Sequence, residues 1–305
     1  DKVLVPLQPS IFDIYATQAF LDKLREHRHA AGVQVGIVGM RIDERTRSAE
    51  QLHHFVEGLG LPVLDDLNGA REEGKGGFAL MNQIIKEGRR QSMARAYLYT
   101  ALARKNVTLL VNAHVDRLTF QGTTATGVEL RRGGVVSKVG ASTEVIVCAG
   151  GINTPKLMML SGIGDPKQLK AHGIKTLVNS PDVGQHFQDH LLHGGCIWEP
   201  NEYLPHRNSA ANASGFAISQ KGLKTPDVNL VQIELPYASD VVAKQYAPPK
   251  TAWALCAGLV APKSRGEIKL RSADPKDRPI VDARFLSHPD DVKALAFGIE
   301  VSRDI

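Results

Sequence analysis

A pair of adjacent glycines, Gly150 and Gly151, ends an apolar stretch and is followed by helix-favouring residues. Because glycine has no Cβ, a turn built from it can approach a ligand closely. The first turn of a helix also presents unpaired N–H groups and the positive end of the helix dipole, which favour a phosphate or a ribose edge. Thr154 is expected to cap this helix and Pro155 to take its first position. The pattern would suit a phosphate or ribose edge, but any glycine turn between a buried strand and a helix has the same pattern, so by itself it favours the plain turn.

A second glycine-rich segment, Gly74 to Gly77, contains Lys75 and invites comparison with a phosphate-binding P-loop. A P-loop needs its lysine after the second conserved glycine, followed by Ser or Thr. Lys75 instead precedes Gly76 and Gly77, and Phe78 comes next. The order of residues therefore argues against a P-loop.

The 11 histidines do not form a recognisable catalytic or metal-binding motif. His53 and His54 are adjacent on an expected helix, so their side chains point in different directions. His190 and His193 follow Asp189, and a structural hydrogen-bonding role is the preferred interpretation for them. The sequence therefore nominates no catalytic residue and no metal site.

The three cysteines, Cys148, Cys196 and Cys256, are too far apart in sequence for a zinc ribbon or a CxxC redox pair. Cys148 ends an apolar stretch and Cys256 lies within one, so both are expected to be buried structural thiols.

The alternation of apolar stretches predicts an α/β protein. Strands are expected at 2–9 and 33–40, each followed by a helix, at 11–28 and 48–60, which is the rhythm of a parallel sheet. A helix at 92–104 and strands at 107–120, 125–130 and 142–151 follow. After Pro181, strands at 228–235 and 266–272 and a closing helix that begins at Pro289 indicate a second, mixed α+β domain.

Composition restricts the class of protein. A chain of 305 residues has room for two domains, and 43% hydrophobic with 23% charged residues is typical of globular proteins. The net charge is +5, but the densest basic cluster, Arg25 to His29, includes Glu26 and is interpreted as a solvated helix face, not a nucleic-acid site. With no leader and no stretch of about 18 apolar residues, we expect a cytoplasmic protein in a reducing compartment, without a membrane span.

The segment "GGINTPKLMMLSGIG" closely resembles the second signature of the glucose-methanol-choline (GMC) family of FAD-dependent oxidoreductases. Its most characteristic parts are Thr154-Pro155 and Ser161 to Gly164, while Gly151 stands where that family more often has another small residue. Further segments resemble the family in the same order from Asp65 to Ile305. One departure is His186, where the family usually has Asn.

The resemblance implies a partial FAD-binding lobe, with strands around Val107 to Leu118 and Val145 to Cys148, and a substrate lobe with an antiparallel sheet. It implies backbone contact with the adenine side of FAD at Val115, and a turn near the cofactor at Ala149-Gly150. The implied reaction oxidises the CH–OH group of a small alcohol, as in choline or alcohol dehydrogenases: a base takes the hydroxyl proton while hydride passes to the flavin.

Two family features are not found in this sequence. These are the GxGxxG fingerprint that holds the FAD pyrophosphate, and the C-terminal segment with the catalytic histidine, which would lie beyond Ile305. We therefore expect the flavoenzyme to be incomplete in this chain. The identity of the alcohol, the electron acceptor and the oligomeric state are not determined by the sequence.

The first 64 residues resemble the C-terminal part of ParA-like partition ATPases, whose Walker motif would precede Asp1. Three parts are therefore expected: a βαβα segment at 1–64, a partial FAD-binding lobe at 65–180 and a partial substrate lobe at 181–305. One hypothesis is a chimeric chain joined near Leu64 and Asp65, and the alternative is a natural protein with a divergent N-terminus. Two other functions stay open: a non-enzymatic fragment, or a remnant of a partition-type ATPase.

Overall fold

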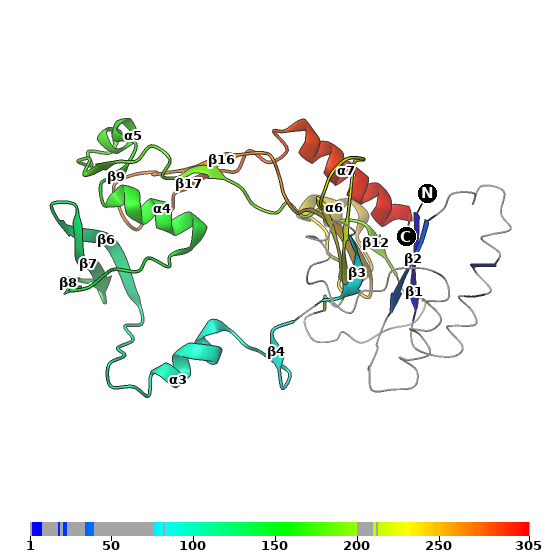
Figure 1. Cartoon of the computed structure of the whole chain (residues 1–305), viewed down its shortest axis with the longest axis horizontal. Coiled ribbons are helices and arrows are strands. Elements are labelled where there is room, and N and C mark those ends of the chain that lie inside the picture. The colour runs from blue at the N-terminus through cyan, green and yellow to red at the C-terminus, as the bar shows by residue number, and fades with distance from the viewer. Residues whose placement is uncertain are drawn as a thin grey trace. The chain divides into compact units, whose positions relative to one another are not determined.

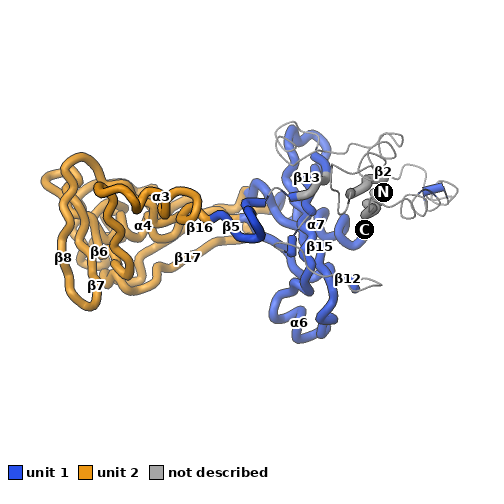
Figure 2. The backbone as a smooth tube through the Cα atoms, turned by 90° about the horizontal axis from the view of Figure 1, so that it is seen from below, with its two compact units in different colours: residues 1–91, 190–262, 289–305 blue, residues 92–189, 263–288 orange. Residues whose placement is uncertain are grey.

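The computed structural model describes residues 2–7, 18, 21–22, 34–39, 76–81, 83–199, 210–211 and 213–304. The expected helices at 11–28 and 48–60 lie almost wholly outside the described residues. The chain divides into two compact units that are interleaved along the sequence (Figure 2). Unit 1 comprises 1–91, 190–262 and 289–305, and unit 2 comprises 92–189 and 263–288. The three consecutive parts expected from the sequence stay a prediction, because the join near 64 lies outside the described residues.

The first two strands of unit 1 form a parallel pair. Strand β1 (Lys2–Leu7) pairs with β2 (Gln34–Gly39) in the register Lys2 to Gln34 through Leu7 to Gly39 (Figure 1). This confirms the parallel arrangement that the two short apolar stretches predicted. The prediction of a fold that mixes helices and sheets is also confirmed.

The main sheet of unit 1 is antiparallel and has the strand order β12-β15-β14-β13-β3. Its strands are β3 (Gly77–Leu80), β12 (Ile197–Trp198), β13 (Ala213–Ala217), β14 (Val228–Ile233) and β15 (Trp253–Leu259). The short helix α6 (Asp240–Tyr246) follows β14 and is capped by the Ser239 side chain. A hairpin of β4 (Ile85–Lys86) and β5 (Arg89–Arg90) completes the described elements of unit 1 before its last helix.

Helix α7 (Pro289–Asp304) covers the main sheet and begins at the proline that the sequence indicated. Acidic residues in its first turn and Arg303 in its last turn match the helix dipole. Buried residues of β14, β15 and α7 form one core: Val228, Leu230, Ala257, Leu259, Ala294 and Leu295. A Cβ at Gly298 would lie 2.8 Å from the Ala257 side chain, so this glycine lets the helix approach the sheet closely.

Unit 2 is built on an antiparallel three-stranded sheet of β6 (Ala113–Gln121), β7 (Thr124–Arg132) and β8 (Val135–Gly140). Before it come η1 (Ala94–Leu98), a π-helical turn, and α3 (Tyr99–Ala101), in place of the single helix expected there. After it come α4 (Gly150–Leu160) and α5 (Pro166–Ala171). The remaining strands are β9 (Ile163–Gly164), β10 (Val178–Asn179), β11 (Gln185–Phe187), β16 (Gly266–Lys269) and β17 (Ile280–Asp282).

The core of unit 2 joins α4 and α5 to β16 and the residue that follows it. Met159, Leu160, Leu169, Ile268 and Leu270 are buried together there. Segments far apart in the sequence therefore share one hydrophobic cluster, which explains why 263–288 belongs to this unit.

Of two strand predictions in unit 2, the one at 142–151 was wrong and the one at 107–120 is confirmed only from Ala113 onward. Residues 107–111 and 145–148 have no ladder partner among the described residues, and the strand predicted at 107–120 begins only at Ala113. Both segments are apolar, yet Ile146 is 74% exposed and Leu109 is also exposed. A strand forms when a neighbour takes up its N–H and C=O groups, and apolar composition alone cannot supply that neighbour.

His186, where the sequence departs from its family resemblance, occupies an unusual backbone position. It lies at a register shift in β11 between Gln185 and Phe187, and its φ is 60°. This left-handed region is disfavoured for most side chains but is adopted more readily by Asn, Asp and His. The backbone thus accounts for both the usual Asn and the histidine found here.

We expect His186→Asn to leave the free energy of unfolding unchanged or raise it slightly. His186→Val should lower it by about 1–2 kcal/mol, because a β-branched residue is strained at this φ. Denaturant unfolding of the three proteins provides the measurement. Equal destabilisation by both substitutions would show that the imidazole, not the backbone angle, matters at this position.

Candidate functional site

The N-terminus of α4 begins at the glycine pair. The helix includes Gly150, with Ala149 as its N-cap, so Thr154 does not cap it and Pro155 lies inside it, contrary to expectation. The physical reason is the φ of +80° at Gly150, which turns the chain into the helix about one turn before Thr154. The sequence prediction placed the helix start from the residues that favour a cap or a first turn. It missed that a glycine with a positive φ can itself begin the helix.

The first turn of α4 is open. No side chain caps it, and Ala149, Gly150 and Gly151 are exposed. Within the described part of the chain, a Cβ built at Gly150 or Gly151 would meet no atom within 4 Å. This turn therefore has the space and the uncapped N-terminal N–H groups that suit an anionic ligand group.

The C-terminal half of the same signature is closely packed. The Ser161 hydroxyl donates to Leu157 O at 2.6 Å and accepts the Leu118 N–H of β6 at 2.9 Å. Gly162 has a φ of +87°, and a Cβ there would lie 2.7 Å from Lys175 O. The Gly162 carbonyl accepts the N–H groups of Leu177 and Val178. This half of the signature thus joins α4 to β6 and β10.

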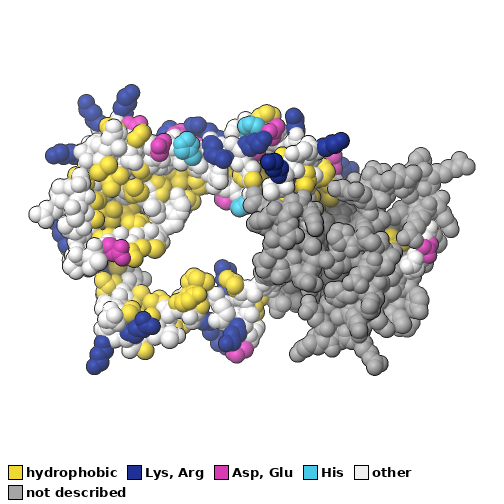
Figure 3. Space-filling model, viewed as in Figure 1, with side chains coloured by type: hydrophobic (Ala, Val, Ile, Leu, Met, Phe, Trp, Pro, Cys, Tyr) yellow, Lys and Arg dark blue, Asp and Glu magenta, His cyan; other side chains and the backbone are white. Residues whose placement is uncertain are grey.

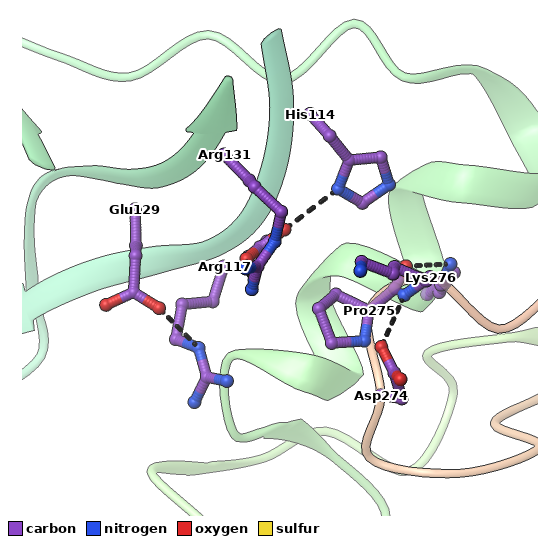
Figure 4. A network of polar contacts seen from close by, with 9 residues as sticks. His114, Arg117, Glu129, Arg131, Asp274, Pro275 and Lys276 are labelled. Carbon is purple, nitrogen blue, oxygen red and sulfur yellow. Dashed lines mark hydrogen bonds and ion pairs between the residues drawn. The ribbon is translucent and has the colours of Figure 1, made fainter. Parts of the chain in front are cut away.

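Strand β6 carries Val115, the predicted adenine contact, next to a buried carboxylate. Asp116 is 1% exposed. Its Oδ1 lies 2.9 Å from His114 Nδ1, and its Oδ2 accepts from an Arg131 Nη at 2.9 Å (Figure 4). Burial by itself would raise the pKa of Asp116, but the hydrogen bonds and charges of His114 and Arg131 outweigh it and lower that pKa.

A buried lysine connects α4 to the loop before β17. The Lys156 ammonium donates to Pro275 O at 2.6 Å, and the loop itself is held by Asp274, whose carboxylate accepts the Lys276 N–H (Figure 4). Because Lys156 is buried at this contact, α4 is fixed at its middle as well as at its C-terminus.

Apolar side chains are exposed along several segments of unit 2. They include Met93, Tyr97, Tyr99 and Leu110 before β6, and Ile146 and Ile152 beside the glycine pair. Figure 3 shows hydrophobic side chains on the surface along the segment that contains α3.

The cysteines differ in exposure. Cys256 is buried, as expected, and burial together with the neighbouring Cys196 raises its pKa to about 11. Cys148 is exposed, so the expectation of a buried thiol there was wrong. The reason is the same as for the missing strand: residues 145–148 have no partner segment within the described part of the chain.

The two histidines after Asp189 belong to unit 1, whereas the open turn belongs to unit 2. His190 Nδ1 lies 2.8 Å from Leu259 O, in keeping with a structural role. His193 Nδ1 is buried with no hydrogen-bond partner in the part of the chain that the structure describes, and burial lowers the pKa of His193. Across the described ranges, no three His, Cys, Asp or Glu side chains are grouped as a metal site would require.

The chain belongs to the GMC oxidoreductase family. The family's N-terminal model matches residues 12–192, and its C-terminal model matches 262–305. The N-terminal match begins within the segment compared above with partition ATPases, and no comparison shows that second resemblance. FAD, the cofactor implied by the sequence resemblance, is supported by this membership.

Similar proteins include an oxygen-dependent choline dehydrogenase of Brucella canis, which is 33% identical over 322 residues that cover 94% of this chain and 57% of that protein. Pyridoxine 4-oxidase from Mesorbium loti has a similar structure, with a TM-score of 0.73 and 27% identity, covering 87% of this chain and 52% of that one. An FAD-dependent oxidoreductase from Chaetomium thermophilum shares the fold, with a TM-score of 0.67 at 18% identity over 99% of this chain and 61% of that one. The chain spans about half the length of the relatives it matches. No helix in the described ranges is both long and apolar enough to cross a membrane.

Gly162→Ala should destabilise unit 2 strongly, by more than about 2 kcal/mol, because it adds a backbone clash to a left-handed φ. Gly173→Ala is a matched control: its φ is +70°, but a Cβ there meets nothing within 4 Å. The control should cost only the conformational penalty of about 1 kcal/mol. Denaturant unfolding measures both, and equal losses would argue against a packing role for Gly162.

Asp116 should stabilise the fold only above acidic pH. Its pKa is lowered in the folded state, so its contribution is complete above the unfolded value of 3.8 and is lost as pH falls through the lower folded value. We expect Asp116→Asn to cost about 2 kcal/mol at pH 6 and progressively less below pH 4. Urea unfolding from pH 6 to pH 2.5 measures the difference. A difference that is constant across this range would contradict the proposed ionic role.

Proposed function

We propose that this chain contributes to an FAD-dependent oxidoreductase of the GMC type that acts on the CH–OH group of a small alcohol such as choline. The observation that carries the proposal is the open first turn of α4, where a Cβ at Gly150 or Gly151 meets no atom of the described residues within 4 Å. The turn lies in the family signature, in the same compact unit as Val115. The choline dehydrogenase named above supports the substrate class.

The residues fit such a cofactor in chemical type. The uncapped N–H groups at the start of α4 would favour its phosphate or ribose oxygens, and the lack of side chains at Gly150 and Gly151 leaves room beside them. Val115 would offer backbone groups of β6 to the adenine. When bound, FAD supplies the acceptor for the hydride that leaves the alcohol carbon.

The partial lobes expected from the sequence belong to this proposal. The sheet β6-β7-β8 with α4 would belong to the FAD-binding lobe, and the antiparallel sheet that contains β14 and β15 would belong to the substrate-binding lobe. No residue of the described chain is nominated as the base that takes the hydroxyl proton. His190 is held at Leu259 O, which favours a structural role.

Two alternatives keep weaker support. A remnant of a partition-type ATPase would rest on the resemblance of residues 1–64, yet the GMC match already begins at residue 12. The second alternative is a non-enzymatic fragment of the same family. It differs from the proposed enzyme in that the chain would not bind FAD. The chimera hypothesis predicts a join near Leu64, within the range that the family model matches.

FAD retention tests the proposal. The purified chain is incubated with excess FAD, freed of unbound ligand, and examined for flavin absorbance. We expect a retained flavin band, together with slower alkylation of the exposed Cys148, which is adjacent to Ala149. No band and unchanged alkylation would favour the non-enzymatic fragment.

Gly151→Leu tests the position of the cofactor. A Cβ at Gly151 meets no atom of the described ranges within 4 Å, and this residue has no positive φ. The substitution should therefore leave thermal unfolding unchanged while it fills the open space. FAD retention should fall at least tenfold. Gly140→Leu is the matched control, since Gly140 also lacks a positive φ and its Cβ would meet only Thr126 O, at 3.8 Å. Equal retention by both variants would place the cofactor elsewhere.

A further inference from the structure

Strand β6 contains a β-bulge at Asp116. Val115 pairs with Leu130 and Arg117 pairs with Glu129, so β6 advances two residues while β7 advances one. Asp116 is the additional residue. A bulge leaves one residue outside the regular ladder and changes the direction of the backbone on either side of it. Val115, the residue before the bulge, is therefore oriented by whatever fixes Asp116.

The side chain of the bulge residue is held at both carboxylate oxygens. His114 contacts Oδ1 from β6, and Arg131 donates to Oδ2 from β7. These two partners also face each other in the ladder, because His114 pairs with Arg131. The carboxylate thus connects the bulge to the ladder pair that precedes it, across both strands.

The burial of the Asp116 carboxylate is not explained by stability alone. A buried ion pair often contributes no more to stability than well-packed apolar side chains would. Arg131 Nε is also buried and has no hydrogen-bond partner among the described residues, so the cluster does not satisfy all of its own polar groups. A carboxylate is useful here if the strand must keep a defined bulge, because two oriented hydrogen bonds specify geometry in a way that apolar contacts do not.

The same two strands carry a second ion pair on the other side of the bulge. Arg117 Nε lies 3.3 Å from Glu129 Oε1, and the Arg117 side chain is exposed. Asp116 pairs with Arg131 instead, and the Glu129 side chain is less buried than that of Asp116. This pair is a natural control for charge removal in the same sheet.

We propose that Asp116 is a positioning residue, which holds the bulge so that the backbone of Val115 faces the adenine end of the cofactor. The inference rests on the proposed function, because it assumes that Val115 contacts adenine. Asp116 itself touches no ligand in this account. Its role is exerted through the backbone of the preceding residue.

The experiment compares the wild-type chain with Asp116→Asn and Glu129→Gln. Affinity is measured for FAD, for ADP, which has adenine without flavin, and for FMN, which has flavin without adenine. Asparagine is nearly isosteric, but its amide nitrogen cannot accept a hydrogen bond from Arg131. Amide hydrogen exchange at residues 115–117 without ligand reports on the bulge directly, and far-UV circular dichroism verifies folding.

For Asp116→Asn we expect faster exchange at residues 115–117, at least tenfold weaker binding of FAD and ADP, and unchanged affinity for FMN. Glu129→Gln should change none of these. Equal weakening of all three ligands, or unchanged binding of FAD and ADP, would overturn the inference while leaving the proposed function in place. Failure of the wild-type chain to bind FAD and ADP would overturn the proposed function, and the inference with it.

Discussion

The Ser161 hydroxyl forms the contact on which the arrangement of unit 2 depends. It donates to the last turn of α4 and accepts an N–H from β6, so one side chain joins the helix to the edge of the sheet. The chain then reverses at Gly162, whose carbonyl receives two N–H groups from the segment at β10. Because the helix is anchored at its C-terminus, and by buried Lys156 at its middle, its N-terminus can stay open.

The two halves of the family signature therefore have different structural roles: the second half is packed against the rest of unit 2, and the first half is open. In Ser161 to Gly164, a Cβ at Gly162 would clash with Lys175 O at 2.7 Å, and a Cβ at Gly164 would make a tight contact with the Met159 side chain at 3.2 Å. At Gly150 and Gly151 a Cβ would meet nothing within the described chain. At Gly150 the φ of +80° by itself favours glycine, whereas Gly151 has no positive φ, so its missing side chain is the one that would leave room for the proposed ligand.

Buried charges organise the sheet and the loop that flank α4. Asp116 is paired across β6 and β7, and Lys156 reaches Pro275 in the loop before β17. Such contacts are costly to break because each would leave a buried polar group without its partner. They give unit 2 defined positions for Val115 and for the start of α4, which is what binding to a rigid, multi-ring cofactor would require.

Sequence reasoning succeeded where a local pattern was also the physical cause. The parallel strands at 2–7 and 34–39 and the start of the last helix at Pro289 were predicted from apolar stretches and from proline. It failed at 145–148, where an apolar stretch has no partner strand among the described residues. It also failed at Thr154, which was expected to cap α4, whereas the helix begins one turn earlier at Gly150, a glycine with a positive φ. It also did not predict β8, whose residues are exposed along its whole length and lack an alternating pattern.

The sequence by itself determined the family, because the order of signature segments is a property of the chain and needs no coordinates. It also determined which residues can adopt special backbone angles, since glycine at 150 and 162 is a matter of residue type. Only the tertiary structure decided that one glycine lies in open space and the other is packed against Lys175 O. It alone showed that Asp116 is buried at a bulge between His114 and Arg131. Burial and pairing depend on residues brought together from other strands and loops, and no local pattern records which residues those will be.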